Sequence, residues 1–98
     1  MPEFTNPFAG KNCEKKLSAD ELIRAIRFSI ASEYEAIQIY DQIANSTDDK
    51  MIKQVLKDIA DEEKVHAGEF LKVLKILSPA EFEFYAQGRH EVEEKFLQ

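Results

Sequence analysis

Glu63 and His66 are the residues whose types and spacing point most directly to chemistry. They lie three residues apart inside a run of apolar positions spaced by four and three, namely Ile52, Leu56, Ile59, Phe70, Val73 and Leu77. Continuing this rhythm through the gap places both side chains on the face that an amphipathic helix turns toward a core. A carboxylate and an imidazole on one helical face can hold a metal ion in front of them.

Glu33 interrupts a second apolar stripe earlier in the chain. The stripe keeps its four-three spacing only if Glu33 is counted with Ile26, Ile30, Ile37, Tyr40 and Ala44. Burying an unpaired carboxylate costs several kcal/mol, unless a proton, a cation or a metal ion compensates its charge. A mixed set of carboxylate and imidazole ligands binds iron, manganese or zinc better than it binds magnesium or calcium. The sequence therefore predicts a compensating charge beside these glutamates.

Helices are the elements that must position these residues. Ser18 and Glu21 match a capping box, and Ser78 followed by Pro79 is a second start signal. The polar link between the first two helices is short, so the second helix should fold back antiparallel, with Ser46 or Thr47 as its cap. We predict an all-α fold with an extended arm over residues 1–17 and a helical domain over 18–98, whose helices span about 19–44, 48–77 and 79–97.

The hairpin should bring the two interruptions together. Glu33 lies 14 residues before Thr47 and Glu63 lies 16 residues after it, so they occupy matching heights on the two helices. One Glu plus one Glu-x-x-His is half of a carboxylate-bridged di-iron site, which in a four-helix bundle uses two of each. The chain cannot supply the other half, because its second histidine, His90, follows Gln87 rather than a glutamate at that spacing.

A second copy of the chain can complete the site. If two chains meet with these faces together, each contributes Glu33, Glu63 and His66, and the site lies on a two-fold axis. Four carboxylates then balance two divalent ions, as a buried site requires. The predicted fold is therefore an antiparallel two-helix hairpin plus a shorter C-terminal helix, which completes a four-helix bundle by dimerisation.

Length and composition limit the class of protein. The 98 residues are 44% hydrophobic and 33% charged, typical of one small globular domain whose thin core favours oligomerisation. The net charge of -6 argues against nucleic acid and anionic membrane surfaces as partners. Cys13 is the single cysteine, so no intrachain disulfide can form. No membrane-spanning run or signal peptide is recognisable, and we expect a cytoplasmic protein.

Two segments carry a resemblance to a known family. The segments SEYEAIQIYDQ (residues 32–42) and DEEKVHA (61–67), joined by STD (46–48), resemble the encapsulated ferritins, which are half-length, two-helix members of the ferritin-like superfamily. The similarity covers about residues 18–77. It implies homodimers that rebuild a four-helix di-iron ferroxidase centre, assembly of these dimers into a ring-shaped decamer, and packaging as cargo of an encapsulin shell protein. No targeting tail for such a shell is recognisable after residue 93.

The resemblance also implies roles for individual residues. The family's iron ligands fall on Glu33, Glu63 and His66, and its tyrosine near the centre falls on Tyr40. Tyr40 can hydrogen-bond a ligand carboxylate, or it can be a core tyrosine on the apolar stripe.

A metal-access site is a second feature that the family implies. Glu35 matches one member of the acidic cluster that forms this site, whereas Ser32 stands where the family has another acidic residue. Glu62 and Glu69 are interpreted as surface charges.

The implied reaction is oxidation of ferrous to ferric iron by dioxygen, serving iron storage or detoxification inside an encapsulin nanocompartment. Two alternatives stay open. One is a ferritin-like di-metal protein with a peroxidase-type role, as in rubrerythrins, or with a di-manganese site; the lack of a Cys-x-x-Cys motif argues against rubrerythrin chemistry. The other is a non-enzymatic helical oligomerisation module in which the buried glutamates pair with lysines.

Overall fold

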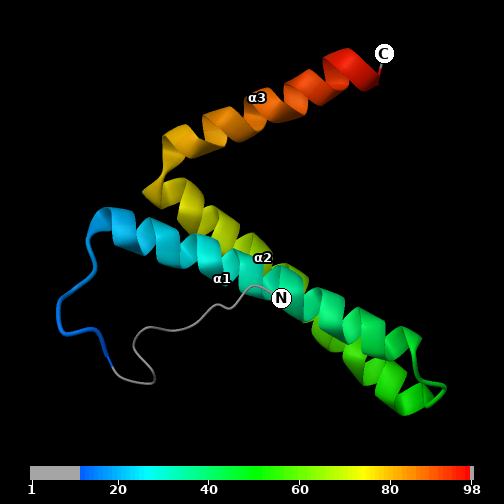
Figure 1. The fold of residues 1–98 in the computed structure, drawn as a ribbon. Coiled ribbons are helices and arrows are strands. Elements are labelled where there is room, and N and C mark those ends of the chain that lie inside the picture. Colours follow the sequence, from blue (N-terminus) through cyan, green and yellow to red (C-terminus); the bar gives the residue numbers. More distant parts are fainter. Residues whose placement is uncertain (1–11, 98) are drawn as a thin grey trace.

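A computed structural model of the chain describes residues 12–97. It contains three helices, α1 (Ala19–Asn45), α2 (Lys50–Leu77) and α3 (Pro79–Phe96), and no strand among the described residues. Helices α1 and α2 lie antiparallel along their length, whereas α3 leaves the end of this hairpin and points away from it (Figure 1). The all-α hairpin with a shorter third helix is therefore confirmed.

The arm predicted over residues 1–17 is described only in part. Residues 1–11 lie outside the described part of the chain, and residues 12–17 are exposed and form no helix.

The capping box fixes the first residue of α1. The Ser18 hydroxyl accepts a hydrogen bond from the Glu21 backbone N–H at 3.2 Å, and the Glu21 carboxylate accepts one from the Ser18 N–H at 2.8 Å. Two backbone N–H groups that the helix leaves without partners are satisfied in this way.

Ser18→Ala is expected to destabilise the protein by about 1 kcal/mol, because it removes the side-chain acceptor of this capping box. Chemical denaturation followed by circular dichroism measures the loss. Ser32→Ala is the matched control, because Ser32 is exposed within α1 and caps nothing. An equal loss of stability in both variants would contradict the capping role.

The start of α2 differs from the prediction. The helix begins at Lys50 rather than near residue 48, and its cap is Asp49, whose carboxylate accepts a hydrogen bond from the Ile52 N–H at 3.0 Å. Ser46 cannot cap α2, because it is the C-cap residue directly after α1 and its hydroxyl donates to the Gln42 carbonyl at 2.7 Å. Thr47 instead accepts a hydrogen bond from the Asp49 N–H and supports the turn.

Small residues form much of the core between α1 and α2. Ala44, Ala60 and Ala67 are buried together with the larger Ile30 and Leu74. Alanines at a helix contact allow the two helix backbones to approach closely. Ala60 and Ala67 lie on either side of Glu63 and His66 along α2.

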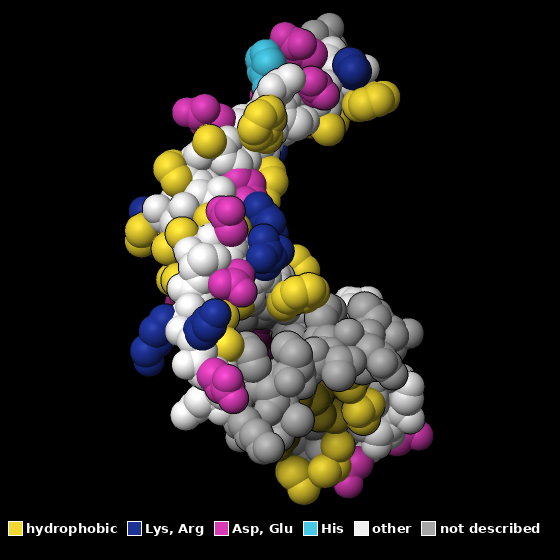
Figure 2. All heavy atoms as spheres, turned by 60° about the vertical axis from the view of Figure 1, so that its left-hand side comes forward, with side chains coloured by type: hydrophobic (Ala, Val, Ile, Leu, Met, Phe, Trp, Pro, Cys, Tyr) yellow, Lys and Arg dark blue, Asp and Glu magenta, His cyan; other side chains and the backbone are white. Residues whose placement is uncertain are grey.

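Many large apolar side chains remain on the surface of a single chain. Hydrophobic side chains lie open on the face shown in Figure 2. The exposed hydrophobic residues of the two helices α2 and α3 include Val65, Ile76, Phe84, Val92 and Phe96. None of the described residues of α3 is buried. Most of the apolar side chains of α3 are therefore exposed in the described part of a single chain.

A single residue, Ser78, separates α3 from α2. Its N–H donates to the Leu74 carbonyl at 2.7 Å, and its carbonyl accepts from the Glu81 N–H at 3.1 Å. The predicted start signal is correct in position, because Ser78 precedes Pro79 at the first helical residue, but the Ser78 side chain makes no capping hydrogen bond to a backbone N–H. Among the described helices, none combines the length and the apolarity that a membrane span requires.

Candidate metal centre

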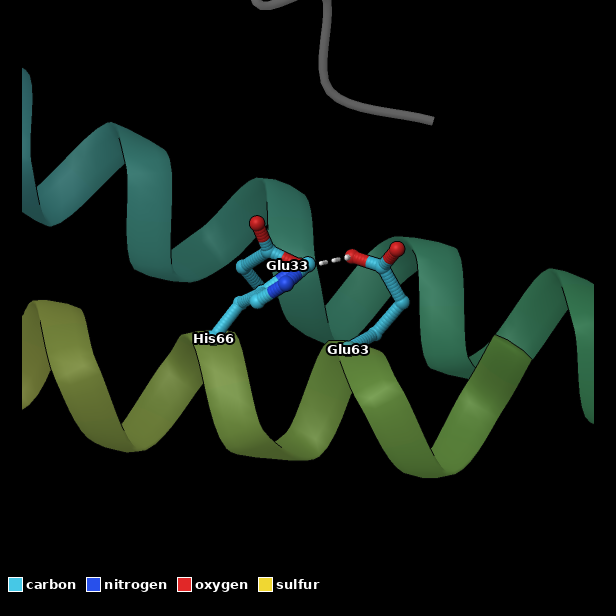
Figure 3. Close-up of side chains that lie close together, drawn as sticks. All are labelled: Glu33, Glu63 and His66. Carbon is cyan, nitrogen blue, oxygen red and sulfur yellow. Dashed lines mark ion pairs between the residues drawn. The ribbon is translucent and has the colours of Figure 1, made fainter. Parts of the chain in front are cut away.

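Three predicted ligands converge between the two long helices. Glu33 projects from α1, and Glu63 and His66 project from α2 toward it (Figure 3). One ligand atom from each residue lies within 4.8 Å of the other two. His66 Nδ1 is 3.6 Å from Glu63 Oε2 and 3.8 Å from Glu33 Oε2. The spacing predicted from the sequence therefore produces one cluster.

The two carboxylates are largely buried, whereas the imidazole reaches the surface. The side chains of Glu33 and Glu63 are 15% and 20% exposed, and that of His66 is 49% exposed. Glu33 Oε2 is buried and has no hydrogen-bond donor in the described part of the chain. A buried carboxylate oxygen without a donor is costly, so the site favours a cation at this atom.

The pKa of Glu33 reflects the same cost of a buried negative charge. Its pKa is raised, first because the neighbouring Glu63 carboxyl can share a proton with it, and then because burial and the charge of Glu63 oppose ionisation; His66 acts in the opposite direction. A hydrogen bond between the two carboxyl groups requires one of them to be protonated, because two carboxylates have no donor between them. A metal ion can replace this proton and satisfy both carboxylates.

The local sequence explains why these side chains meet. Glu63 is three residues after the buried Ala60, and His66 directly precedes the buried Ala67, so both lie at the edge of the α1–α2 contact. Glu33 lies three residues after the buried Ile30 on α1. Glu33 and Glu63 therefore each lie about one helical turn from a core position, and His66 lies about one turn beyond Glu63 on the same face of α2.

A hollow of about 230 Å³ adjoins the cluster. It is lined by Glu33, His66, Glu69, Phe70 and Val73. Glu69 was interpreted from the sequence as a surface charge, and it is exposed, but it also lines this hollow beside two of the ligands. The signal for it was its position three residues after His66, on the same side of α2.

Tyr40 and Glu35 are not brought into the cluster. Tyr40 is half-buried, but it lies 7 residues after Glu33, about 10 Å along the helix axis, and makes no hydrogen bond to the three ligands within the described residues. Glu35 is half-buried two residues after Glu33, and residues at that spacing do not face each other on a helix; Ser32 is exposed. The roles of Tyr40 and of Glu35 at an access site stay predictions.

The donor set fits iron but is incomplete within one chain. Two carboxylates and one imidazole are suitable ligands for iron. The buried Glu33 oxygen has no hydrogen-bond partner in the described residues and can bind a cation. Three residues do not fill the coordination of two metal ions. A hairpin with a Glu on one helix and Glu-x-x-His on the other is half of the unit that ferritin-like bundles use twice.

Comparison with known proteins agrees with a ferritin-like helical protein. The rubrerythrin family model matches residues 25–97. The crystal structure of the encapsulated ferritin domain from Pyrococcus furiosus superposes with a TM-score of 0.88 at 33% identity, covering 99% of this chain and 98% of that domain. The chain therefore belongs to the rubrerythrin-type, ferritin-like family, among the encapsulated ferritins.

Two longer proteins are also similar in sequence. A ferritin-like–encapsulin shell fusion protein of Pyrococcus furiosus is 36% identical over 83 residues, which are 85% of this chain and 24% of that protein. An encapsulin nanocompartment cargo protein of Myxococcus xanthus is 37% identical over 79 residues, which are 81% of this chain and 59% of that protein. The chain thus spans about a quarter of the first relative and about three-fifths of the second.

Proposed function

We propose that the protein is a ferroxidase, which oxidises ferrous to ferric iron at a di-iron site shared between two copies of the chain. The observation that carries this proposal is the half-site itself. Glu33 holds a buried oxygen without a donor against Glu63 and His66, and the three ligand atoms lie within 4.8 Å of one another. Such a cluster is unfavourable without a cation and incomplete without a second copy.

Each residue of the half-site has a separate task in this reaction. The carboxylates of Glu33 and Glu63 supply the negative charge that binds ferrous iron and favours the ferric product, and His66 supplies the nitrogen ligand. When two iron ions are bound, they supply two electrons together to dioxygen. Because the Glu33 pKa is raised, protons compete with iron for the Glu33–Glu63 pair more strongly than at an ordinary carboxylate, so binding should weaken as the solution becomes more acidic.

We further propose that homodimers assemble into a ring-shaped decamer within an encapsulin nanocompartment in the cytoplasm. The names of the two longer relatives, a nanocompartment cargo protein and a fusion to a shell protein, support this location. The exposed apolar side chains of the hairpin and α3 support contacts with further copies. Tyr40 and Glu35 are proposed to act beside the centre, where they would face the second copy.

Peroxide is the second candidate oxidant. The match to the rubrerythrin family model favours it, whereas a single cysteine cannot form the Cys-x-x-Cys iron site that peroxide-reducing rubrerythrins carry. A di-manganese site would use the same ligands. Metal analysis of the purified protein distinguishes it from a di-iron site. The helical-module alternative requires lysine partners for the buried glutamates, but in residues 12–97 the basic side chain within 4 Å of Glu33 and Glu63 is that of His66.

Oxidation assays test the proposed function. Ferrous iron is added without oxygen, and either dioxygen or hydrogen peroxide is then admitted while ferric absorbance is recorded. A ferroxidase oxidises iron with dioxygen well above the rate in protein-free buffer. Faster oxidation with peroxide than with dioxygen would favour the rubrerythrin-type role, and no acceleration with either oxidant would exclude both.

A further inference from the structure

A cluster of polar side chains links α3 to α1 at a distance from the metal centre. The Arg27 guanidinium donates two hydrogen bonds to the Glu81 carboxylate, from Nη2 at 2.6 Å and from Nε at 3.2 Å. The Tyr85 hydroxyl donates to the same carboxylate. Arg27 belongs to α1, and Glu81 and Tyr85 belong to the first two turns of α3. We call these three residues the α1–α3 bridge.

The α1–α3 bridge spans a gap that the backbones leave open. No Cα atom of α1 lies within 8 Å of a Cα atom of α3. The Glu81 side chain is 13% exposed, and its pKa is lowered to about 2, mainly by the hydrogen bond from Arg27 and then by that from Tyr85. Glu81 is therefore charged at neutral pH and depends on both donors, because an enclosed carboxylate is costly without them.

Beside the bridge lies a hollow of about 570 Å³ between the hairpin and α3. Most of its lining is apolar or aromatic, including Ile30, Tyr34, Leu71, Leu74 and Phe82. Walls of this kind gain free energy by closing on each other and excluding water. None of the described residues of α3 is buried, so little packing against the hairpin resists such a closing motion.

We propose that the α1–α3 bridge sets the direction in which α3 leaves the hairpin. A bidentate arginine–carboxylate pair fixes both distance and orientation, and the tyrosine locks the carboxylate in that geometry. Without the bridge, α3 moves toward the hairpin and the hollow closes. The outward course of α3 seen in Figure 1 thus depends on these three side chains and does not depend on the metal centre.

A spin-label distance measurement tests this role. The exposed residues Asp58 on α2 and Glu93 on α3 are each replaced by cysteine, and spin labels are attached to the two introduced thiols. Cys13→Ser removes the native exposed thiol. Labelled chains are diluted with unlabelled ones, so that only distances within one chain are recorded. The parent should give one narrow distance population. Arg27→Met and Glu81→Gln should lose that population, with the main distance becoming shorter, and Tyr85→Phe should broaden it.

Glu94→Gln is the matched control. It removes a carboxylate from the same helix, but one whose partner, His90, also belongs to α3, so the parent distance should persist. Circular dichroism confirms equal helix content in every variant. The parent distance retained in both Arg27→Met and Glu81→Gln would overturn the proposal, and so would its loss in Glu94→Gln.

Discussion

Replacing Glu63 by Gln is expected to abolish iron oxidation while the protein keeps its helices. The amide is nearly isosteric with the carboxylate but lacks the charge that binds ferrous iron. Mutating groups that only support metal ligands already costs about 10–100-fold in affinity or activity, so losing a ligand should cost about 100-fold or more. Stopped-flow absorbance after mixing anaerobic iron-loaded protein with air-saturated buffer measures the rate.

Glu62→Gln is the matched control for this variant. Glu62 is the adjacent residue on α2, is exposed, and lies outside the ligand cluster, so the same substitution removes the same charge from a different face of the helix. Its oxidation rate should equal that of the parent. Equal losses in the two variants would mean that general negative charge, rather than the Glu33–Glu63–His66 cluster, attracts and oxidises iron.

Replacing Glu33 by Gln should make the metal-free protein more stable at neutral pH but insensitive to added metal. In the unfolded chain Glu33 titrates near its ordinary pKa of 4.5, whereas in the folded chain its pKa is higher, because of the shared proton with Glu63 and burial. The folded state therefore binds the proton more tightly, and metal-free stability falls as pH rises from 4.5 through the raised pKa. A glutamine removes this loss, and its amide can donate to Glu63, a hydrogen bond worth about 1 kcal/mol.

Denaturation midpoints in chelator at pH 5 and pH 8 measure this effect. The free energy of unfolding should fall more between pH 5 and pH 8 in the parent than in Glu33→Gln. Ferrous iron added without oxygen should raise the stability of the parent at pH 8 but not that of Glu33→Gln. Glu35→Gln is the control, since Glu35 is half-buried on the same helix but outside the ligand cluster. A Glu33→Gln protein that is less stable than the parent in chelator would contradict the assigned electrostatics.

The hairpin and its polar cluster were predictable because both follow from local periodicity. The four-three spacing of apolar residues defines the buried face of each helix, and Glu33, Glu63 and His66 stand out as exceptions on that face. The short link then fixes the antiparallel pairing. The cap of α2 was predicted wrongly because Ser46, Thr47 and Asp49 are all good caps, and only the hydrogen bond from Ser46 back to Gln42 excludes the first.

The course of α3 could not be predicted in the same way. Arg27 and Glu81 are 54 residues apart, and nothing in the spacing of either residue indicates that they pair. The sequence pattern also did not reveal that α3 leaves the hairpin. A third helix after a hairpin is compatible both with leaving the hairpin and with packing along it. Glu69 was missed for a related reason: its position beside His66 becomes informative only once the hollow beside the ligands is known.

Native mass spectrometry after anaerobic addition of ferrous iron tests the shared site most directly. If two chains complete one di-iron centre, iron should occur in pairs on dimers or on assemblies of dimers, reaching one ion per chain, and the iron-bound monomer should be absent. The same measurement on Glu63→Gln should show assemblies without bound iron. Iron bound one ion at a time to monomers, or parent dimers that bind none, would contradict a di-iron centre built from two copies.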